Sequence, residues 1–159
     1  MKANYERSLA FTLLQEGSKI TNTPGDHGGL TAAYGLTLTT MKTLNLDLNH
    51  DGVVNAKDII LVTKEVVDRA FHAHFWDPIG GDSLPGGIEL MGADIAWNSG
   101  PGKFLQFRAE GFVSSIEALC DRRIRFFLHL SMEPGQRGFL HDWVTRALDS
   151  KVEAGKCMR

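Results

Sequence analysis

A glycine-rich segment limits the folds open to this chain of 159 residues. Residues 21–37 read TNTPGDHGGLTAAYGLT and contain four glycines and one proline. Proline removes a backbone donor and glycine weakens a helix interior, so this segment cannot continue a helix. Its composition is typical of a β-hairpin or an ordered loop. In such a segment, the backbone freedom of glycine allows neighbouring side chains to take directions that a regular helix does not permit.

A helix is predicted directly before this segment. In residues 4–16, Tyr5, Leu9 and Leu13 recur at helical spacing, and Gly17 ends the run as a C-terminal glycine commonly does. Glu16 therefore lies on the apolar face of the helix, at its end.

Helical patterns also fill most of the chain after the segment. They predict a helix with Thr63 as its N-cap that ends near Trp76, and further helices at about 88–99, 112–131 and 138–149. The sequence therefore predicts a mainly α fold: a helical bundle with a small hairpin or loop region after the first helix.

Residues 47–58, DLNHDGVVNAKD, fit a calcium-binding loop of the EF-hand type. Such a loop uses oxygen ligands at positions 1, 3, 5, 7, 9 and 12 and glycine at position 6. The corresponding ligands are Asp47, Asn49, Asp51, the Val53 carbonyl, Asn55 and Asp58, and Gly52 is the glycine. Position 12 holds aspartate where glutamate is usual, so we expect weaker binding or a water in the shell. The alternative is a solvated acidic turn.

Composition restricts the remaining functions. The chain is 43% hydrophobic and 23% charged, as expected for one globular domain over residues 1–159. A net charge of −2 does not indicate nucleic-acid binding. We interpret the arginine run in residues 120–127 as a mostly solvated helix face; the alternative is contact with anionic cell-envelope polymers. No export signal or membrane span is predicted, and two cysteines fit synthesis in a reducing cytoplasm.

Glu16 and the residues after it indicate glycosidase chemistry. Burial and the negative end of the helix dipole both favour the protonated form of this carboxyl group, which can then protonate a leaving group. Asp26 is the candidate second carboxylate, and Thr31 is a candidate to hold a water or support the transition state. The sequence leaves open whether the configuration at the anomeric carbon is retained or inverted.

The same residues resemble a known family. EGSKITNTPGDHGGLTAAYGLT, AFHAHFWDPI, GADIAWNSG, RRIRFF and GFLHDWVTR are similar to segments of the peptidoglycan-degrading muramidases of glycoside hydrolase family 108. This family occurs in phage lysis proteins and in bacterial secretion-associated lysozymes. Glu16 falls on the family's catalytic acid. TAAYG has one residue more than the usual pattern, which leaves the role open between Thr31 and Thr37. Asp94 and Asn98 match a recurrent pattern, and we expect both to be buried and structural.

The resemblance implies a lysozyme-like α+β fold and cleavage of peptidoglycan between N-acetylmuramic acid and N-acetylglucosamine. Residues 1–78 would be the catalytic segment, with the calcium loop at 47–58, and residues 79–159 a C-terminal helical part. We expect a monomeric phage endolysin with structural Ca²⁺, made in the host cytoplasm and released to the periplasm. The alternatives are a lytic transglycosylase and a non-catalytic, calcium-dependent wall-binding module.

Overall fold

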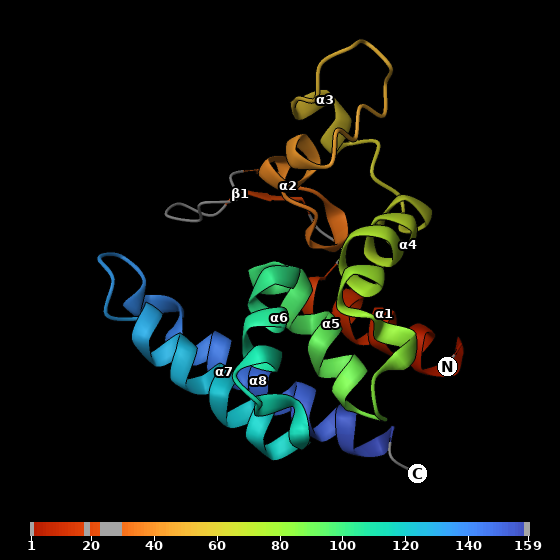
Figure 1. The fold of residues 1–159 in the computed structure, drawn as a ribbon. Coiled ribbons are helices and arrows are strands. Elements are labelled where there is room, and N and C mark those ends of the chain that lie inside the picture. Colours follow the sequence, from red (N-terminus) through yellow and green to blue (C-terminus); the bar gives the residue numbers. More distant parts are fainter. Residues whose placement is uncertain (1, 18–19, 23–29, 158–159) are drawn as a thin grey trace. The chain divides into compact units, whose positions relative to one another are not determined.

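The computed structural model describes residues 2–17, 20–22 and 30–157 (Figure 1). The chain forms two compact units. Unit 1 contains Met1–Thr12 and Ala73–Arg159, and unit 2 contains Leu13–His72. Helix α1, Lys2–Glu16, therefore contributes residues to both units.

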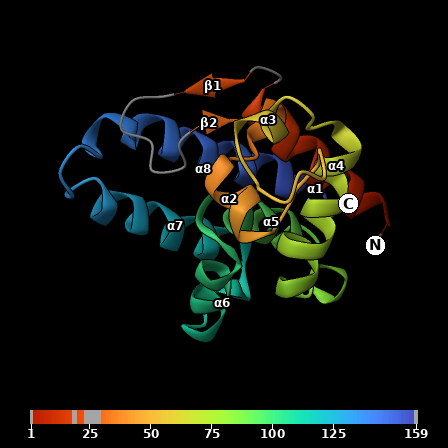
Figure 2. The same cartoon turned by 90° about the horizontal axis from the view of Figure 1, so that it is seen from above.

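Unit 1 is built from helices around a central buried one. This central helix is α5, Ile88–Ser99, and its residues from Ile88 to Ala96 are all buried. The helices packed on it are α6 (Pro101–Ala109), α7 (Ile116–Leu130) and α8 (Leu140–Lys156). Helices α7 and α8 run side by side in both views (Figures 1 and 2). Short helical turns at Phe112–Ser114 and Arg137–Phe139 connect α6 to α7 and α7 to α8. Three more, His72–Trp76, Asp77–Ile79 and Gly81–Ser83, precede α5.

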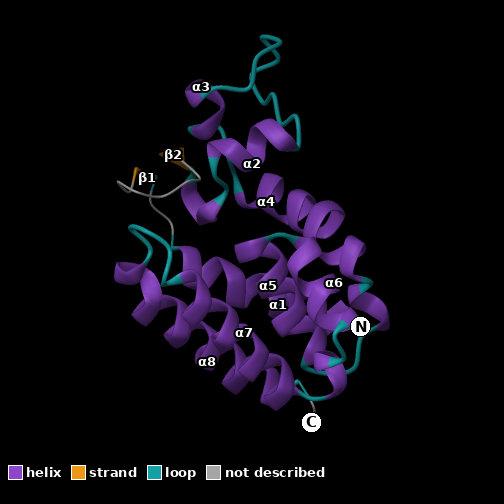
Figure 3. Ribbon diagram, turned by 60° about the vertical axis from the view of Figure 1, so that its left-hand side comes forward, coloured by secondary structure: helices purple, strands orange, loops and turns teal. Residues whose placement is uncertain are grey.

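Unit 2 contains the strands and three short helices. Strands β1 (Thr21–Asn22) and β2 (Leu30–Thr31) pair antiparallel, with Thr21 opposite Thr31. A 3₁₀ turn, Ala33–Gly35, leads into the helices α2 (Leu38–Thr43), α3 (Ala56–Ile59) and α4 (Lys64–Phe71). Figure 3 shows that most of the described part of the chain is helical, with a long loop between α2 and α3.

The predicted mainly α fold with a small hairpin after the first helix is confirmed. Thr63 is an N-cap, since its side chain accepts a hydrogen bond from the Val66 amide. The helix expected at about 112–131 begins only at Ile116, because Ser115 caps it and accepts from the Ala118 amide. The last helix is longer than expected and continues to Lys156.

Helix α6 is absent from the sequence prediction, which ended one helix at about residue 99 and began the next at about residue 112. Gly100 has a φ of 82° and does end α5, but Pro101 then occupies the first turn of a new helix. Proline fits this position because its fixed φ suits a helix and its missing amide hydrogen would have no helical partner. No helix among the described residues is long and apolar enough to cross a membrane.

Candidate functional site

The end of α1 places Glu16 in unit 2. Glu16 is the last residue of the helix and is half-buried. Gly17 follows with a φ of 73°, and its amide donates to the Leu13 carbonyl at 3.2 Å. The Tyr34 amide donates to the Gly17 carbonyl at 3.0 Å. This hydrogen bond fixes the end of α1 to the turn that follows β2.

Gly35 provides the space for the Glu16 side chain. Its φ is 84°, and a Cβ built on it would overlap the Glu16 carboxylate. The turn is closed by two backbone hydrogen bonds, from Ala32 to the Leu36 carbonyl at 2.9 Å and from Gly35 to the Ala32 carbonyl at 3.2 Å. Sequence reasoning counted this glycine as a turn residue, but only the fold shows that its missing side chain makes room for the carboxylate.

Thr31 lies at the start of the same turn. It is half-buried in β2, pairs with Thr21 and forms a second bridge with Thr37. The side chain of Thr37 accepts from the Thr40 amide at 3.0 Å and so caps α2. The fold therefore places Glu16 and Thr31 beside one turn and gives Thr37 a capping role. Asp26, the predicted second carboxylate, lies outside the described residues.

Tyr34 is a further residue of this turn that sequence reasoning missed. It has a left-handed φ of 68°, which is uncommon for a bulky side chain. The ammonium group of Lys64 lies 5.7 Å from the centre of its ring. The cation–π contact joins the turn to the first residue of α4.

The loop at 47–58 has the backbone of a tight polar turn. His50 and Gly52 have positive φ values of 58° and 88°. The Gly52 amide donates to Asp47 Oδ2 at 2.8 Å, and the Asp51 amide donates to Asn49 Oδ1 at 2.9 Å. Side chains at positions 1 and 3 thus fold the loop back on itself.

Asp58 closes the loop from its far end. It is fully buried, and its Oδ1 accepts from the amides of Leu48 and Asn49 at 2.9 and 3.1 Å. Its Oδ2 accepts from the Asn55 amide at 2.8 Å, and Asn55 in turn caps α3. These hydrogen bonds, that from Asn55 first, lower the pKa of the Asp58 carboxyl group. Asp58, at position 12 of the loop, is therefore a negatively charged carboxylate that is hydrogen-bonded to the backbone amides of positions 2 and 3, Leu48 and Asn49.

Among the described residues, one buried side-chain oxygen of the loop has no hydrogen-bond donor. Asp47 Oδ1 is buried and has no hydrogen-bond partner among the described residues, while Oδ2 of the same carboxylate binds Gly52. A buried carboxylate oxygen without a donor is costly, and a hard cation would satisfy it. No three Asp, Glu, His or Cys side chains of the described part gather into a metal-binding group. Asparagine side chains and backbone carbonyls, which loops of the EF-hand type also use as ligands, are not among these four residue types. The loop thus supplies oxygen donors of the kind that Ca²⁺ takes, but its three carboxylates do not converge on one point.

In unit 1, Asp94 forms the centre of a buried ion cluster. Its Oδ2 accepts from Arg123 Nη1 at 2.6 Å, and its Oδ1 accepts from Arg146 Nη2 at 2.7 Å and Nε at 3.0 Å. Arg123 Nη1 also donates to Ser150 Oγ at 3.2 Å. Burial by itself raises the pKa of the Asp94 carboxyl group, but the charges and hydrogen bonds of the two arginines outweigh it and lower that pKa. Helices α5, α7 and α8 are thus joined at one point.

Two predictions about unit 1 are corrected. Arg123 is 1% exposed, so the arginine run is not simply a solvated face; only Arg125, paired with Asp121 at 3.6 Å, fits that description. Asn98 is exposed at the end of α5, contrary to the expectation of burial. Asp94 is buried as expected, and its carboxylate binds Arg123 and Arg146.

One of the three tryptophans, Trp76, belongs to the buried core. It is 1% exposed and packs against Gly81 and Tyr5, so its ring cannot serve as a platform for a sugar. Trp143 is only partly buried, and its ring stacks on Phe127 and Phe139 with ring centres 5.4 and 5.7 Å away.

Comparison with known proteins places these features in a family. The model of the family described as glycosyl hydrolase 108 matches residues 9–100, which include Glu16, the β1–β2 hairpin and the 47–58 loop. The chain belongs to the glycosyl hydrolase 108 family. It is therefore a glycoside hydrolase. None of the curated proteins matches it.

A solved structure of similar fold is described as the structure of Brucella abortus SagA. It is 21% identical, the match covers 100% of this chain and 98% of SagA, and the TM-score is 0.83. At this identity the likeness shows the fold. The shared fold thus includes α6, α7 and α8, which lie beyond the residues that the family model matches. Helices α7 and α8 carry Arg123 and Arg146, the partners of Asp94.

Proposed function

We propose that this glycosyl hydrolase 108 member is a muramidase that hydrolyses peptidoglycan between N-acetylmuramic acid and N-acetylglucosamine. Glu16 is the general acid, Asp26 is the second carboxylate, and Thr31 holds the attacking water or supports the transition state. Family membership supports glycoside hydrolysis, and the turn that holds Glu16 supports the choice of acid.

The packing of Gly35 against the Glu16 carboxylate is the observation that carries this proposal. A surface glutamate at a helix end needs no glycine beside it, because a long side chain can turn into water. Here the turn 32–36 approaches so closely that no other residue fits at 35 without moving the carboxylate. A general acid has to be held in this way to meet the leaving oxygen within hydrogen-bond distance.

The reaction follows from that placement. Glu16 gives its proton to the glycosidic oxygen as the bond from that oxygen to the anomeric carbon breaks, so the leaving sugar departs as a neutral alcohol. A water molecule supplies the oxygen that bonds to the anomeric carbon, and its proton passes to a carboxylate. The sum is the addition of one water across one glycosidic bond.

Analysis of the new chain ends tests the proposed bond. Purified wall is digested, and the products are identified by mass spectrometry. N-acetylmuramic acid at the new reducing ends is expected. Anhydro-muramyl ends alone would make the protein a lytic transglycosylase, and N-acetylglucosamine ends a glucosaminidase. An intact wall would support a non-catalytic, calcium-dependent binding module.

The biological setting that we propose is phage lysis. A monomeric endolysin of this kind is made in the host cytoplasm and meets peptidoglycan after release across the inner membrane. Two free cysteines, Cys120 and Cys157, agree with synthesis under reducing conditions.

We also propose that the 47–58 loop binds a structural Ca²⁺. The ligands are Asp47, Asn49, Asp51, the Val53 carbonyl, Asn55 and Asp58. The buried Asp47 Oδ1, which has no hydrogen-bond donor among the described residues, supports this assignment. When bound, the ion supplies positive charge that offsets the repulsion among three aspartates. It would stabilise the segment between α2 and α3 and take no part in the chemical step.

A further inference from the structure

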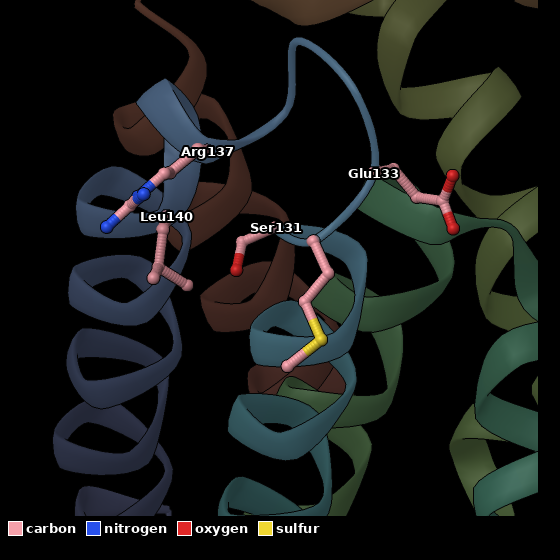
Figure 4. Close-up of a pocket in the computed structure, with 5 residues that line it drawn as sticks. Ser131, Glu133, Arg137 and Leu140 are labelled. Atoms are coloured by element: carbon pink, nitrogen blue, oxygen red, sulfur yellow. The ribbon is translucent and has the colours of Figure 1, made fainter.

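The pocket in unit 1 where α7 turns into α8 has charged side chains that diverge. Figure 4 shows Arg137 and Glu133, two of the residues that line it, pointing away from each other. A site for one ligand needs polar groups that converge. In unit 2, by contrast, several contacts converge on the turn 32–36 beside Glu16.

Tyr34, in the middle of this turn, has a backbone conformation that its own side chain disfavours. Its φ of 68° and ψ of 20° are left-handed, and in this region the Cβ of an L residue comes too close to the backbone. Such strain persists only where the surrounding structure imposes it, and it is frequent at functional sites. The contacts of Tyr34 therefore indicate what keeps the turn in place.

Tyr34 is held through both its backbone and its ring. Its amide donates to the carbonyl of Gly17, the residue directly after Glu16, at 3.0 Å. The ammonium group of Lys64 lies over its ring, 5.7 Å from the ring centre. The next residue, Gly35, packs against the Glu16 carboxylate. Because Tyr34 and Gly35 share a peptide bond, a shift of the Tyr34 backbone also shifts the residue that makes room for the carboxylate.

The position of Lys64 is unfavourable for its own helix. It is the first residue of α4, where the helix dipole is positive and an ammonium group is disfavoured. Thr63 caps this helix, and Glu65 supplies the acidic side chain of its first turn. Stability of α4 therefore does not explain the lysine, whereas the negative face of the Tyr34 ring does.

Helix α4 gives this contact a firm support. Its residues Val67, Ala70 and Phe71 are buried, so the helix is fixed in the core of unit 2. A side chain that projects from a fixed helix is placed more precisely than one on a loop. Lys64 can therefore hold the ring of Tyr34 at a defined place.

We propose that Lys64 is a positioning residue for the Glu16 carboxylate and acts through the Tyr34 ring. The cation–π contact offsets part of the strain at Tyr34 and so keeps Gly35 against the carboxylate. This inference rests on the proposed function for the role of Glu16 as the acid. The positioning of the carboxylate can nevertheless be measured without any reaction.

Steady-state kinetics on soluble peptidoglycan strands test the effect on the reaction. Lys64→Met keeps the length of the side chain but removes its charge. It should lower kcat about two- to fivefold, which corresponds to a cation–π contact at an exposed site, and leave KM unchanged. Lys64→Arg should restore kcat, since a guanidinium also stacks on a ring. Lys42→Met removes an equal charge from an exposed site on α2 and should change neither constant.

A double-mutant cycle tests whether Lys64 acts through the ring. Tyr34→Leu removes the π face, so Lys64→Met should lower kcat no further on that background. Tyr34→Phe keeps the ring and should keep the full sensitivity of kcat to Lys64→Met. Losses that multiply in the Lys64→Met, Tyr34→Leu double variant would overturn the inference.

Carbon NMR of the full-length protein separates this inference from the catalytic proposal. The signal of the Glu16 carboxyl carbon should shift in Lys64→Met and in Tyr34→Leu but not in Lys42→Met. On the Tyr34→Leu background, Lys64→Met should add no further shift, which excludes a direct effect of the charge. An unshifted signal in Lys64→Met would overturn the inference whatever the activity. A shifted signal together with full wall cleavage by Glu16→Gln would instead remove only the proposed function.

Discussion

Gly35 lies directly against the Glu16 carboxylate, and the two residues come from elements separated by the β1–β2 hairpin. The contact depends on a backbone conformation, a φ of 84° at position 35, that side chains other than glycine rarely adopt. The shape of a turn thus controls the position of the proposed acid, and this relationship can be tested.

Gly35→Ala should lower wall cleavage about a hundredfold. The new Cβ would displace the Glu16 carboxylate, and a shift of about 1 Å in a catalytic group can have that effect. Gly111→Ala is the control, because Gly111 has a similar φ of 87° but open space around it. Both variants should lose about 1 to 2 kcal/mol of unfolding free energy from backbone strain. Equal activity in the two variants would show that the Glu16 contact does not matter.

Glu16→Gln should reduce cleavage about a hundred- to ten-thousandfold while the melting temperature stays within about 2 °C of the original. Glutamine preserves the shape but has no acidic proton. The measurement is the rate of turbidity loss with permeabilised cells, together with a thermal melt. A variant that still lyses cells at the original rate would remove Glu16 from the mechanism.

Calcium should stabilise the protein without switching it on. A ligand specific for the folded state adds about 2.7 kcal/mol at a hundred times its dissociation constant. For a chain of this size, that energy corresponds to a rise in melting temperature of about 5 to 11 °C. Asp47→Ala combined with Asp51→Ala should abolish the rise measured with and without a chelator, while Asp149→Ala should keep it.

Two results would contradict a purely structural role for calcium in the 47–58 loop. If calcium leaves the melting temperature unchanged but controls lysis, the loop is regulatory. If calorimetry detects no binding at millimolar calcium, the segment is an acidic turn. Glu16→Gln should keep the full thermal shift, which would separate the calcium site from the catalytic step.

Glu89 should make stability depend on pH. It is 1% exposed, Oε1 accepts from Asn4 at 2.7 Å, and the buried Oε2 has no partner among the described residues. Burial raises the pKa of this carboxyl group, against the effect of nearby backbone amides and Asn4. Because the pKa of Glu89 is higher in the folded protein than in the unfolded chain, the contribution of the protonated group to the free energy of unfolding is complete at pH values below the pKa in the unfolded chain. It is lost as pH rises through the folded-state pKa.

Glu89→Gln should remove that loss, because the amide does not ionise. The difference in unfolding free energy between the variant and the original protein should therefore move in favour of the variant as pH rises. The change is about 1.4 kcal/mol for each unit by which the pKa is raised. Urea titrations at a series of pH values would measure it, and a difference that is constant with pH would contradict the prediction.

Asp94→Asn should destabilise unit 1 by about 3 kcal/mol or more. The substitution removes the carboxylate that pairs with Arg123, which is 1% exposed and too buried to reach water. Asp121→Asn breaks an exposed pair with Arg125 and should cost less than about 1 kcal/mol. Guanidinium denaturation compares the two variants. Similar losses would mean that the buried cluster contributes no more than a surface pair.

The sequence by itself determined the elements with strong local signals. Gly17 ends α1, Thr63 caps α4, and the glycines of residues 21–37 exclude a helix, because each effect acts within a few residues of chain. The position of Glu16 at a helix end follows in the same way. The family could also be inferred, since its motifs are runs of adjacent residues.

Tertiary structure decided what depends on contacts across the chain. The arginines at 123 and 125 look alike in sequence, yet one is buried against Asp94 on α5 and the other faces water. Nothing local distinguishes them, because burial is set by which helix packs on which face. Gly35 is likewise an ordinary turn glycine until the fold brings Glu16 against it. Backbone preferences are local, whereas burial and ion pairing are properties of the packed chain.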